Sequence, residues 1–355
     1  MNLKELTLSR WMEGSGPEND TVISSRVRIA RNIQGIPFPY LASAEQTGAV
    51  QEQVTRAAAA HKEAFTAFSQ YPMEELSPLN KQIMVEKHLV SPFLARDSDH
   101  GAVLLRGDEA VSIMINEEDH LRIQAILPGL QLEEAWHEAD RYDDLLETGI
   151  NYAFDERCGY LTACPTNVGT GLRASVMLHL PALIMTKQIN RLLSALSQVG
   201  LAVRGLYGEG TEIIGNLVQV SNQITLGQAE EEILRNLYSV TRQIIEQEQT
   251  ARQALLNDNR PRIADRSWRA LGLLKFAQMM SSQEAMQLLS DVRLGFDLGL
   301  VKGVDRKLLN ELLVIIRPAC LQLLAGKELS GSERDLERPV QIRKRLNRFQ
   351  KSEES

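Results

Sequence analysis

A change of hydrophobic pattern near residue 225 divides this 355-residue chain into two parts. Before it, short apolar runs bounded by glycines and polar turns are typical of strands. After it, apolar residues recur every three or four positions, as they do on one face of a helix. The pattern therefore predicts an α+β fold, in which an antiparallel sheet flanked by helices is followed by an all-helical C-terminal domain.

Two apolar runs at residues 102–106 and 110–116 are joined by the turn Gly107-Asp108-Glu109 and predict a β-hairpin. Sequential strands joined in this way pair antiparallel. A helix is expected from Pro181 to about residue 199, because proline favours the first helical turn. Further strands are predicted at residues 121–127, 158–163, 174–180 and 212–221.

The second part begins with a helix that Thr225 and Gln228 are expected to start as a capping box. The turn-forming residues 257–261 then mark a boundary. We therefore expect a lead-in at residues 1–20, a catalytic domain at 21–256 and a helical domain at 257–355. Four helices are predicted in the last domain, at residues 262–280, 282–298, 305–324 and 332–349.

Composition narrows the function classes. Lys and Arg number 39 and Asp and Glu 46, and a net charge of −7 does not favour direct nucleic-acid binding. Three cysteines are too few for a disulfide framework, so a cytoplasmic location is expected. No signal peptide or membrane span is predicted. The chain has no Cys-x-x-Cys or His-Glu-x-x-His motif, so no metal held by protein side chains is expected.

Nucleotide-binding signatures are few. The chain has no Walker A loop. Residues 169–174 match Gly-x-Gly-x-x-Ala, but they run into a predicted strand and not into the helix that a dinucleotide site needs.

Five arginines stand beside strands and glycine turns. Each alone is more often a solvated surface charge, but together they suggest a clamp for an oxyanion, because guanidinium groups match phosphate oxygens. The acidic triplet Glu117-Glu118-Asp119 suggests carboxylates that hold a cationic acceptor, although such triplets are usually solvated turns. The arginines are Arg26, Arg28, Arg122, Arg173 and Arg204.

Four segments in order, residues 24–28, 116–122, 164–173 and 204–209, resemble the phosphagen kinases, the ATP:guanidino phosphotransferases. Members that act on metabolites carry about a hundred further residues before the first segment, and here about twenty precede it. A helical domain follows the last segment instead. This arrangement resembles the protein-arginine kinases of bacteria within the same family.

The resemblance implies ATP and Mg²⁺, with the metal held mainly by phosphates and water. It implies Glu118 as the base, Glu209 as a second carboxylate and Cys164 as a reactive thiol. Cys158 and Cys320 are expected to be buried small apolar residues, and Glu117 and Asp119 to be structural. The residues that the resemblance places near the nucleotide are Ser24, Ser25, Arg26, Val27, Arg28, His88, Arg122, Arg173, Ala174, Ser175, Val176, Met177, Arg204, Gly205, Leu206, Tyr207 and Gly208.

Near the C-terminus, Arg334, Asp335 and Arg338 resemble a phosphoarginine-binding motif of protein-arginine kinases, with Pro339 in place of the usual alanine. An alternative is a helix start, with Ser332 as N-cap and Asp335 at the third helical position; both can hold together. Proline disfavours helix at the preceding residue, which affects the geometry of such a pocket.

The resemblance implies phosphorylation of exposed arginines in proteins, a mark for Clp-dependent degradation, in a stress response with a zinc-finger activator protein and a heat-shock repressor. A homodimer through the C-terminal helices is also expected. One alternative is a kinase for free arginine or another small guanidine. Another is a phosphoarginine-binding adaptor with weak catalysis, against which the intact carboxylates and arginines count.

Overall fold

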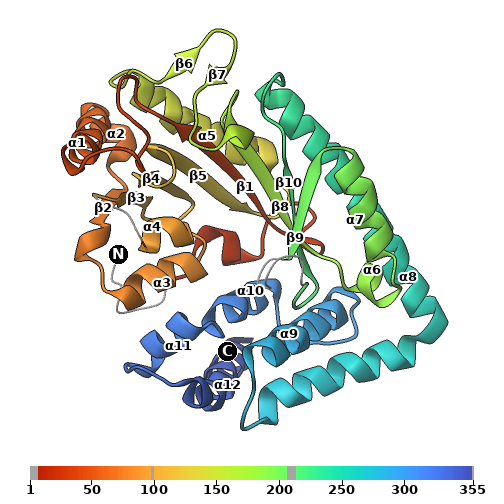
Figure 1. Ribbon diagram of the computed structural model, residues 1–355. Coiled ribbons are helices and arrows are strands. Elements are labelled where there is room, and N and C mark those ends of the chain that lie inside the picture. The colour runs from red at the N-terminus through yellow and green to blue at the C-terminus, as the bar shows by residue number, and fades with distance from the viewer. Residues whose placement is uncertain (1–6, 97–99, 206–212, 354–355) are drawn as a thin grey trace.

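An eight-stranded antiparallel sheet forms the centre of the computed structural model, which describes residues 7–96, 100–205 and 213–353 (Figure 1). The strand order is β2-β3-β4-β5-β1-β8-β10-β9, so the first long strand lies in the middle. The predicted α+β class with an antiparallel sheet is confirmed. The strands are β1 Val22–Arg31, β2 Phe68–Pro72, β3 Ala102–Arg106, β4 Val111–Ile115, β5 Leu121–Pro128, β8 Leu172–His179, β9 Leu201–Gly205 and β10 Leu217–Asn222.

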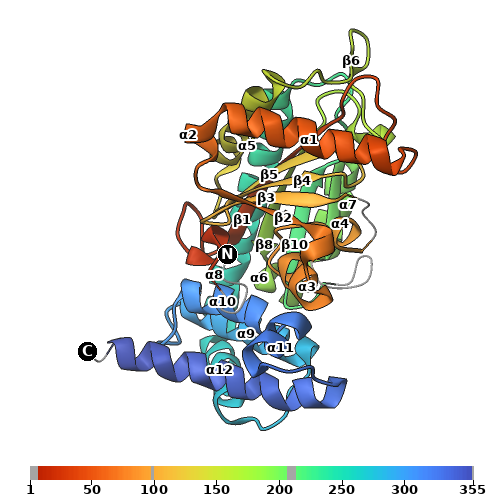
Figure 2. The ribbon, with the colours of Figure 1, turned by 90° about the vertical axis from the view of Figure 1, so that its left-hand side faces the viewer.

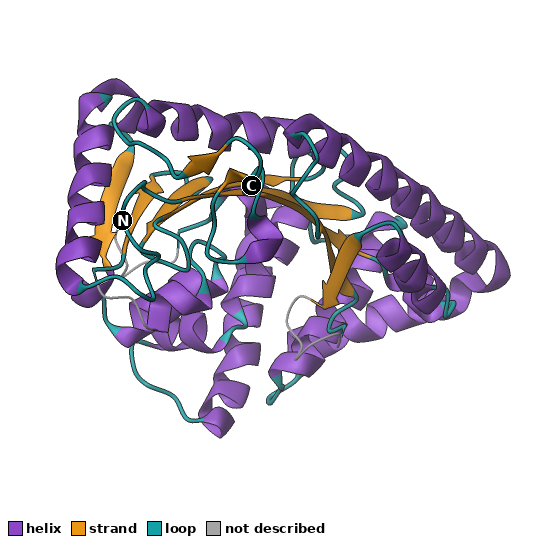
Figure 3. Ribbon diagram, turned by 45° about the horizontal axis from the view of Figure 1, so that its top comes forward, coloured by secondary structure: helices purple, strands orange, loops and turns teal. Residues whose placement is uncertain are grey.

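Three long helices cover one face of the sheet, and Figure 3 shows them along the outer side of its arch. They are α1 Ala44–Ala60, α5 Leu132–Glu147 and α8 Glu230–Phe276. Alternate residues of the central strands, such as Val27, Ile29 and Val176, pack with them into the main core. Since successive side chains of a strand point to opposite faces, the residues between them face the other way.

The opposite face is covered in two parts. Over β3 and β4 it packs against the helices η2 Met73–Glu75, α3 Pro78–Glu86 and α4 Pro92–Arg96. Over the central strands, Ile126, Met177 and Leu217 pack against the C-terminal helices and against η1 Arg10–Glu13. Figure 2 shows those helices as a layer at one end of the sheet.

Several expected elements differ in extent. The hairpin of β3 and β4 and strand β5 are confirmed. The strand expected at 158–163 is reduced to a two-residue pairing of β6 Phe154–Asp155 with β7 Gly159–Tyr160. The helix expected from Pro181 to 199 is two helices, α6 Pro181–Met185 and α7 Ile189–Gln198, separated at Lys187, whose φ is 60°. The remaining short helices are α2 Lys62–Phe65 and η3 Pro165–Asn167.

The predicted capping box at Thr225 is wrong. Its hydroxyl donates instead to the carbonyls of Thr166 (3.0 Å) and Val168 (2.7 Å), and α8 begins at Glu230. The turn expected at 257–261 is a kink inside α8, where Asn259 leaves helical geometry just before Pro261. A backbone that loses a donor at proline often bends there.

The C-terminal helices are the second half of α8, then α9 Ser282–Asp297, α10 Arg306–Ile315, α11 Pro318–Ala325 and α12 Gly331–Glu353. The single helix expected at 305–324 is α10 and α11, which meet at an angle of 89° before Pro318. The expected cap by Ser332 is also wrong. Ser330 and Glu333 form the reciprocal capping bonds at the start of α12.

Among the described residues, no single helix has both the length and the hydropathy of a membrane span. Helices α10 and α11, which are bent against one another, have the length and hydropathy of a span only when they are counted as one segment.

Candidate active site

Strand register brings the predicted arginines onto the same face of the sheet. Arg28 on β1 lies directly opposite Gln124 on β5 and opposite Arg173 on β8. Arg26 is two residues from Arg28 on β1, and Arg122 is two residues from Gln124 on β5, so both point to the same face as Arg28. Arg204 on β9 is opposite Gln219 on β10. Residues almost 180 positions apart in the chain therefore form one polar surface.

This surface is the floor of a cavity of about 490 Å³. All five predicted arginines line it, and helix α3 and the segment after it form one wall. That wall includes Val85, His88, Val90 and Pro92, so the cavity combines cationic and apolar surfaces. A cavity of this size with a few convergent charged groups is typical of a small-molecule site.

The arginines are crowded without enough carboxylates to balance them. Burial, together with the charges of Arg26, Arg122 and Arg173, holds the pKa of Arg28 well below its usual value. Burial and the charges of Arg204 and Arg122 lower the pKa of Arg173 in the same way. The Nε atoms of Arg28 and Arg173 are buried and have no hydrogen-bond partner among the described residues. Such a cluster is complementary to a polyanion.

Two arginines of the cluster are oriented by polar neighbours. Arg26 donates to the Gln219 side chain at 3.0 Å and to the Ser175 hydroxyl at 3.4 Å. Arg122 pairs with the buried carboxylate of Glu117 at 2.7 Å. The expected structural role of Glu117 is consistent with this contact, because it fixes the direction of a guanidinium that faces the cavity.

His88 occupies a strained position at the cavity wall, with a φ of 62°. Its carbonyl accepts a 2.9 Å hydrogen bond from Gln124, which holds the segment to the sheet. Burial and the charges of Arg26 and Arg317 lower the pKa of its imidazole to about 3. The ring is therefore neutral at physiological pH and can accept a hydrogen bond or stack.

Glu118 lies at the tip of a tight turn between β4 and β5, where Asn116 has a φ of 55°. The neighbouring Asp119 is buried and accepts from the Asn32 amide (2.7 Å) and from the backbone N–H of Ala163 (2.6 Å). Glu117 and Asp119 are both anchored by these contacts. The half-buried Glu118 between them lies near Arg173, and its negative charge favours the charged form of that guanidinium. The turn thus directs one carboxylate to the edge of the arginine cluster.

Cys164 also lies near Arg173. Its Sγ is 3.0 Å from the Thr166 hydroxyl, and the residue precedes the short helix η3. Cys320 is buried, as expected. The expectation that Cys158 is buried is wrong, because the short hairpin of β6 and β7 leaves it exposed.

Other residues that were expected near the nucleotide differ in position. The side chains of Ser25, Val27, Ala174 and Val176 face away from the cavity; Ser25 donates to the Gly129 carbonyl at 2.9 Å, and the other three are in the main core. Ser24, Ser175 and Met177 share the arginine face, where Met177 packs on the C-terminal helices, and Gly205 lines the cavity. Leu206, Tyr207, Gly208 and Glu209 lie outside the described residues.

Several residues that line this cavity were not expected from the sequence, among them the polar residues Gln82, Glu86 and Arg317. The first two belong to α3 and resemble ordinary residues of a helix surface. Arg317 comes from the C-terminal domain, and only the docking of that domain brings it here. Its one local signal is its position before Pro318, which predicts a helix boundary but no ligand.

The residues of the C-terminal motif are held by contacts with neighbouring helices. Arg338 is buried and donates to the Ile316 carbonyl at 3.0 Å, while its Nη1 pairs with Asp335 at 2.6 Å. Arg334 is partly exposed and donates to the Leu329 carbonyl. Pro339 cannot donate to the Asp335 carbonyl, and the Met280 N–H bonds that oxygen instead at 2.9 Å. Helix α12 therefore continues through Pro339.

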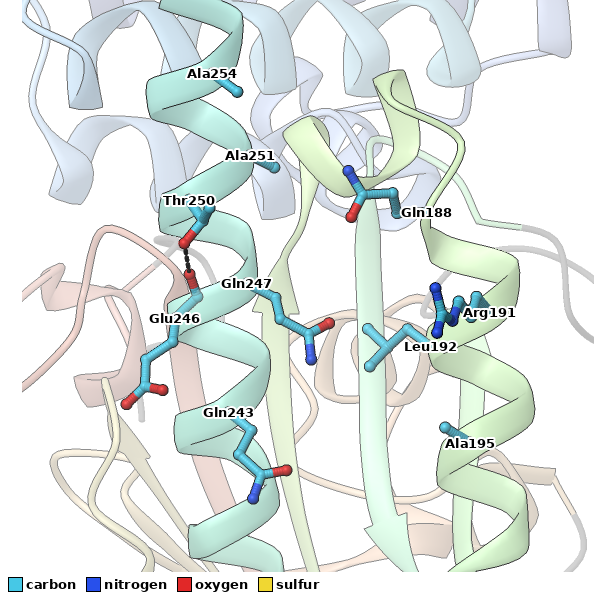
Figure 4. A pocket seen from close by; sticks show the side chains of 10 residues that line it. All are labelled: Gln188, Arg191, Leu192, Ala195, Gln243, Glu246, Gln247, Thr250, Ala251 and Ala254. Carbon is cyan, nitrogen blue, oxygen red and sulfur yellow. Dashed lines mark hydrogen bonds between the residues drawn. The ribbon is translucent and has the colours of Figure 1, made fainter.

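A second hollow, of about 630 Å³, lies between α7 and α8 (Figure 4). Its lining is mostly amide and small side chains, with one basic residue, Arg191, and one acidic residue, Glu246, and no cluster of like charge. It is therefore a poorer match to a polyanion than the arginine cavity. Within the described part of the chain, no group of three or more His, Cys, Asp or Glu side chains is arranged to hold a metal ion.

Comparison with known proteins agrees with this geometry. Residues 49–251 match the family model of the ATP:guanido phosphotransferase C-terminal catalytic domain, and residues 260–355 match that of the protein-arginine kinase McsB C-terminal domain. The chain is similar to the protein-arginine kinase of Moorella thermoacetica, with 56% identity over 340 residues, 95% of this chain and 97% of that protein. With the protein-arginine kinase of Brevibacillus brevis it shares 55% identity over 341 residues, 95% of each chain.

Among solved structures, lombricine kinase superposes with a TM-score of 0.60 at 26% identity, over 71% of each chain. The duplicated taurocyamine kinase from Schistosoma mansoni has a TM-score of 0.56 at 24% identity. It covers 70% of this chain and 35% of that one, and shows the same fold.

Proposed function

Because the chain belongs to the protein-arginine kinase family of ATP:guanido phosphotransferases, we propose that it transfers the γ-phosphoryl group of ATP to arginine side chains of proteins. The observation that carries the proposal is the cavity floored by Arg26, Arg28, Arg122 and Arg173, with Glu118 at its edge. The cluster supplies the charge that a triphosphate needs, and the carboxylate supplies the base that a guanidinium acceptor needs.

ATP and Mg²⁺ fit the residues present. Crowded guanidinium groups with buried, unbonded Nε atoms match a triphosphate, which would offer them the acceptors they lack. The described residues offer no carboxylate set for a metal, so Mg²⁺ would be held mainly by phosphate oxygens and water. The metal would neutralise charge as the phosphoryl group moves.

The acceptor chemistry follows from Glu118. An arginine guanidinium is protonated at neutral pH and has no free electron pair for attack. Glu118 accepts one N–H proton while that nitrogen bonds to the γ-phosphorus, and the bond from phosphorus to the β,γ-bridging oxygen breaks to release ADP. Cys164 and the proposed second carboxylate Glu209 would align the guanidinium by hydrogen bonds and charge.

The substrate is proposed to be a protein side chain because relatives that match 95% of the chain are named protein-arginine kinases. By the same resemblance, we propose cytoplasmic action in a stress response, with Clp-dependent degradation of the marked proteins. A zinc-finger activator and a heat-shock repressor would be its partners, and Arg334, Asp335 and Arg338 would bind phosphoarginine.

We also propose a homodimer. Among the described residues of the C-terminal region, five large apolar side chains are exposed and are candidates for its interface: Trp268, Leu273, Phe276, Met279 and Leu336.

The test is to incubate the protein with Mg·ATP and either a protein with accessible arginines, such as casein, or free arginine, and to measure acid-labile phosphate. The proposal expects phosphate on the protein and little on free arginine. Phosphorylation of free arginine alone would show a small-guanidine kinase, and binding of phosphoarginine without transfer to either acceptor would show an adaptor.

A further inference from the structure

The C-terminal helical domain contributes one guanidinium to the nucleotide cavity. Arg317 lies at the 89° bend between α10 and α11 and lines the cavity together with Arg26 and His88. Burial lowers the pKa of His88 most, and the charges of Arg26 and Arg317 lower it further. Both guanidinium groups therefore lie close to the imidazole. No other residue of the C-terminal domain lines this cavity among the described residues.

The backbone on both sides of Arg317 is fixed by hydrogen bonds. The Glu86 carboxylate, on α3, is 5% exposed and accepts from the N–H groups of Ala319 (2.9 and 3.1 Å) and Cys320 (2.9 Å). This contact joins the first turn of α11 to the wall of the cavity. On the other side, the Ile316 carbonyl accepts from Arg338 at 3.0 Å.

Local geometry adds to this restraint. The backbone N–H of Arg317 donates to the Val314 carbonyl at 3.0 Å, and Pro318 restricts the chain at the start of α11. A side chain whose backbone is held in this way starts from a fixed position, so less freedom is lost when it binds a ligand.

We infer that Arg317 is a sixth arginine of the nucleotide site and binds ATP from the C-terminal domain. The inference rests on the proposed function. Arg317 lines the cavity on the side of α3, whose Glu86 binds the start of α11, whereas neither Glu118 nor Cys164 is among the lining residues. It therefore contributes to nucleotide affinity and not to the transfer step. Glu86 acts as a positioning residue, through the start of α11.

The first experiment measures the Kd of Mg·ATP by calorimetry, and KM and kcat by phosphorylation of casein, for Arg317→Ala. Loss of one charge-assisted contact should raise Kd and KM for Mg·ATP by about 10- to 100-fold. An interaction made equally in the ground and transition states leaves kcat within about twofold. Lys307→Ala, an exposed charge on α10, is the matched control and should leave both constants unchanged.

Arg317→Met, which keeps the aliphatic stem, tests the same point should Arg317→Ala disturb the bend. The unfolding midpoint of each variant without ligand shows whether the fold is intact. A Kd for Mg·ATP within about twofold of wild type, or an equal loss in Lys307→Ala, overturns the inference. Failure of the wild type itself to bind Mg·ATP would instead contradict the proposed function.

The role of Glu86 is tested by Glu86→Gln alone and combined with Arg317→Ala. If Glu86 acts by placing Arg317, it should weaken Mg·ATP binding in the wild-type background and add nothing to Arg317→Ala. Losses that multiply in the double variant would show that Glu86 acts independently, and would overturn its positioning role.

Discussion

Arg28 and Arg173 lie directly opposite one another on adjacent strands β1 and β8, with no carboxylate between them. Like charges at opposed positions of a sheet are destabilising, and the charge of Arg173 helps to lower the pKa of Arg28. Their placement is explained by a polyanion that offsets the repulsion when it binds. The unliganded protein is therefore less stable with two arginines at these positions than it would be with two apolar residues.

Replacing Arg28 with Met should therefore stabilise the unliganded protein and abolish its response to ATP. We expect the free energy of unfolding to rise by up to ~1 kcal/mol without ligand, because a buried like-charge contact is removed. In wild type, Mg·ATP at about 100 times its Kd should add roughly 2.7 kcal/mol. Urea unfolding with and without Mg·ATP measures both. Arg235→Met, an exposed site on α8, is the control, and an Arg28→Met protein that ATP still stabilises fully would contradict the assignment.

Changing Glu118 to Gln should slow phosphoryl transfer by about 100-fold or more, because the amide cannot accept the guanidinium proton. Mg·ATP affinity should change by less than about twofold, since Glu118 is not among the residues that line the arginine cavity. Turnover on casein and calorimetry with Mg·ATP measure the two effects. Glu133→Gln, whose side chain is 81% exposed on α5, should behave like wild type. Near-normal turnover of Glu118→Gln would exclude it as the base.

Alkylation of Cys164 should inactivate the enzyme, and nucleotide together with acceptor should protect it, because the thiol lies beside Arg173. Cys158 is exposed and will also be labelled, so the experiment is best done in Cys158→Ser. Peptide mapping against residual activity follows the two events. Inactivation that tracks Cys320, or an unprotected loss of activity, would disprove this role.

The neutral state of His88 predicts a specific pH dependence of stability. Its pKa is about 3 in the folded protein, below the ordinary 6.5, so the unfolded chain binds one more proton as the pH falls through 6.5. Stability is therefore full above that pH and is lost below it, by about 1 kcal/mol between pH 7 and 5.5. His88→Asn should lack this loss, and asparagine tolerates the φ of 62°.

Urea unfolding of both proteins at the two pH values measures the difference. Burial raises the pKa of Asp143 to about 6, so its contribution to stability falls as the pH rises toward 6. This effect of opposite sign is present in both proteins and cancels in the comparison. Equal slopes for wild type and His88→Asn would show that the imidazole has the same pKa in the folded and unfolded states.

The C-terminal motif predicts weak, specific binding of phosphoarginine. Arg334→Ala or Asp335→Ala should raise the Kd of phosphoarginine by about tenfold, as each removes a charge-assisted bond. Pro339→Ala should bind equally well or better, because α12 is already continuous at Pro339. Calorimetry decides this, with the exposed Lys344→Ala as control on the same helix. If the wild type does not bind phosphoarginine, the binding role is wrong and the motif only holds α12 to its neighbours through Arg338.

Local pattern was enough to predict those elements whose hydrophobic faces are clear. The hairpin of β3 and β4 and strand β5 alternate or run apolar over their full lengths and form as expected. Where local signals competed with distant partners, the prediction was wrong. The hydroxyl of Thr225 can accept from a helix N–H or donate to a carbonyl, and the folded chain places two carbonyls within its reach.

Three features follow from local sequence pattern: the two-part organisation, the antiparallel class of the sheet, and the alternation that puts Arg26 and Arg28 on one strand face. Periodicity carries that information because it acts between near neighbours. In contrast, the position of Arg173 against Arg28, and the arrival of Arg317 at the same cavity from another domain, depend on long-range packing. Strand order and domain docking are fixed by the burial of surfaces far apart in the chain, and no local pattern encodes which surfaces meet.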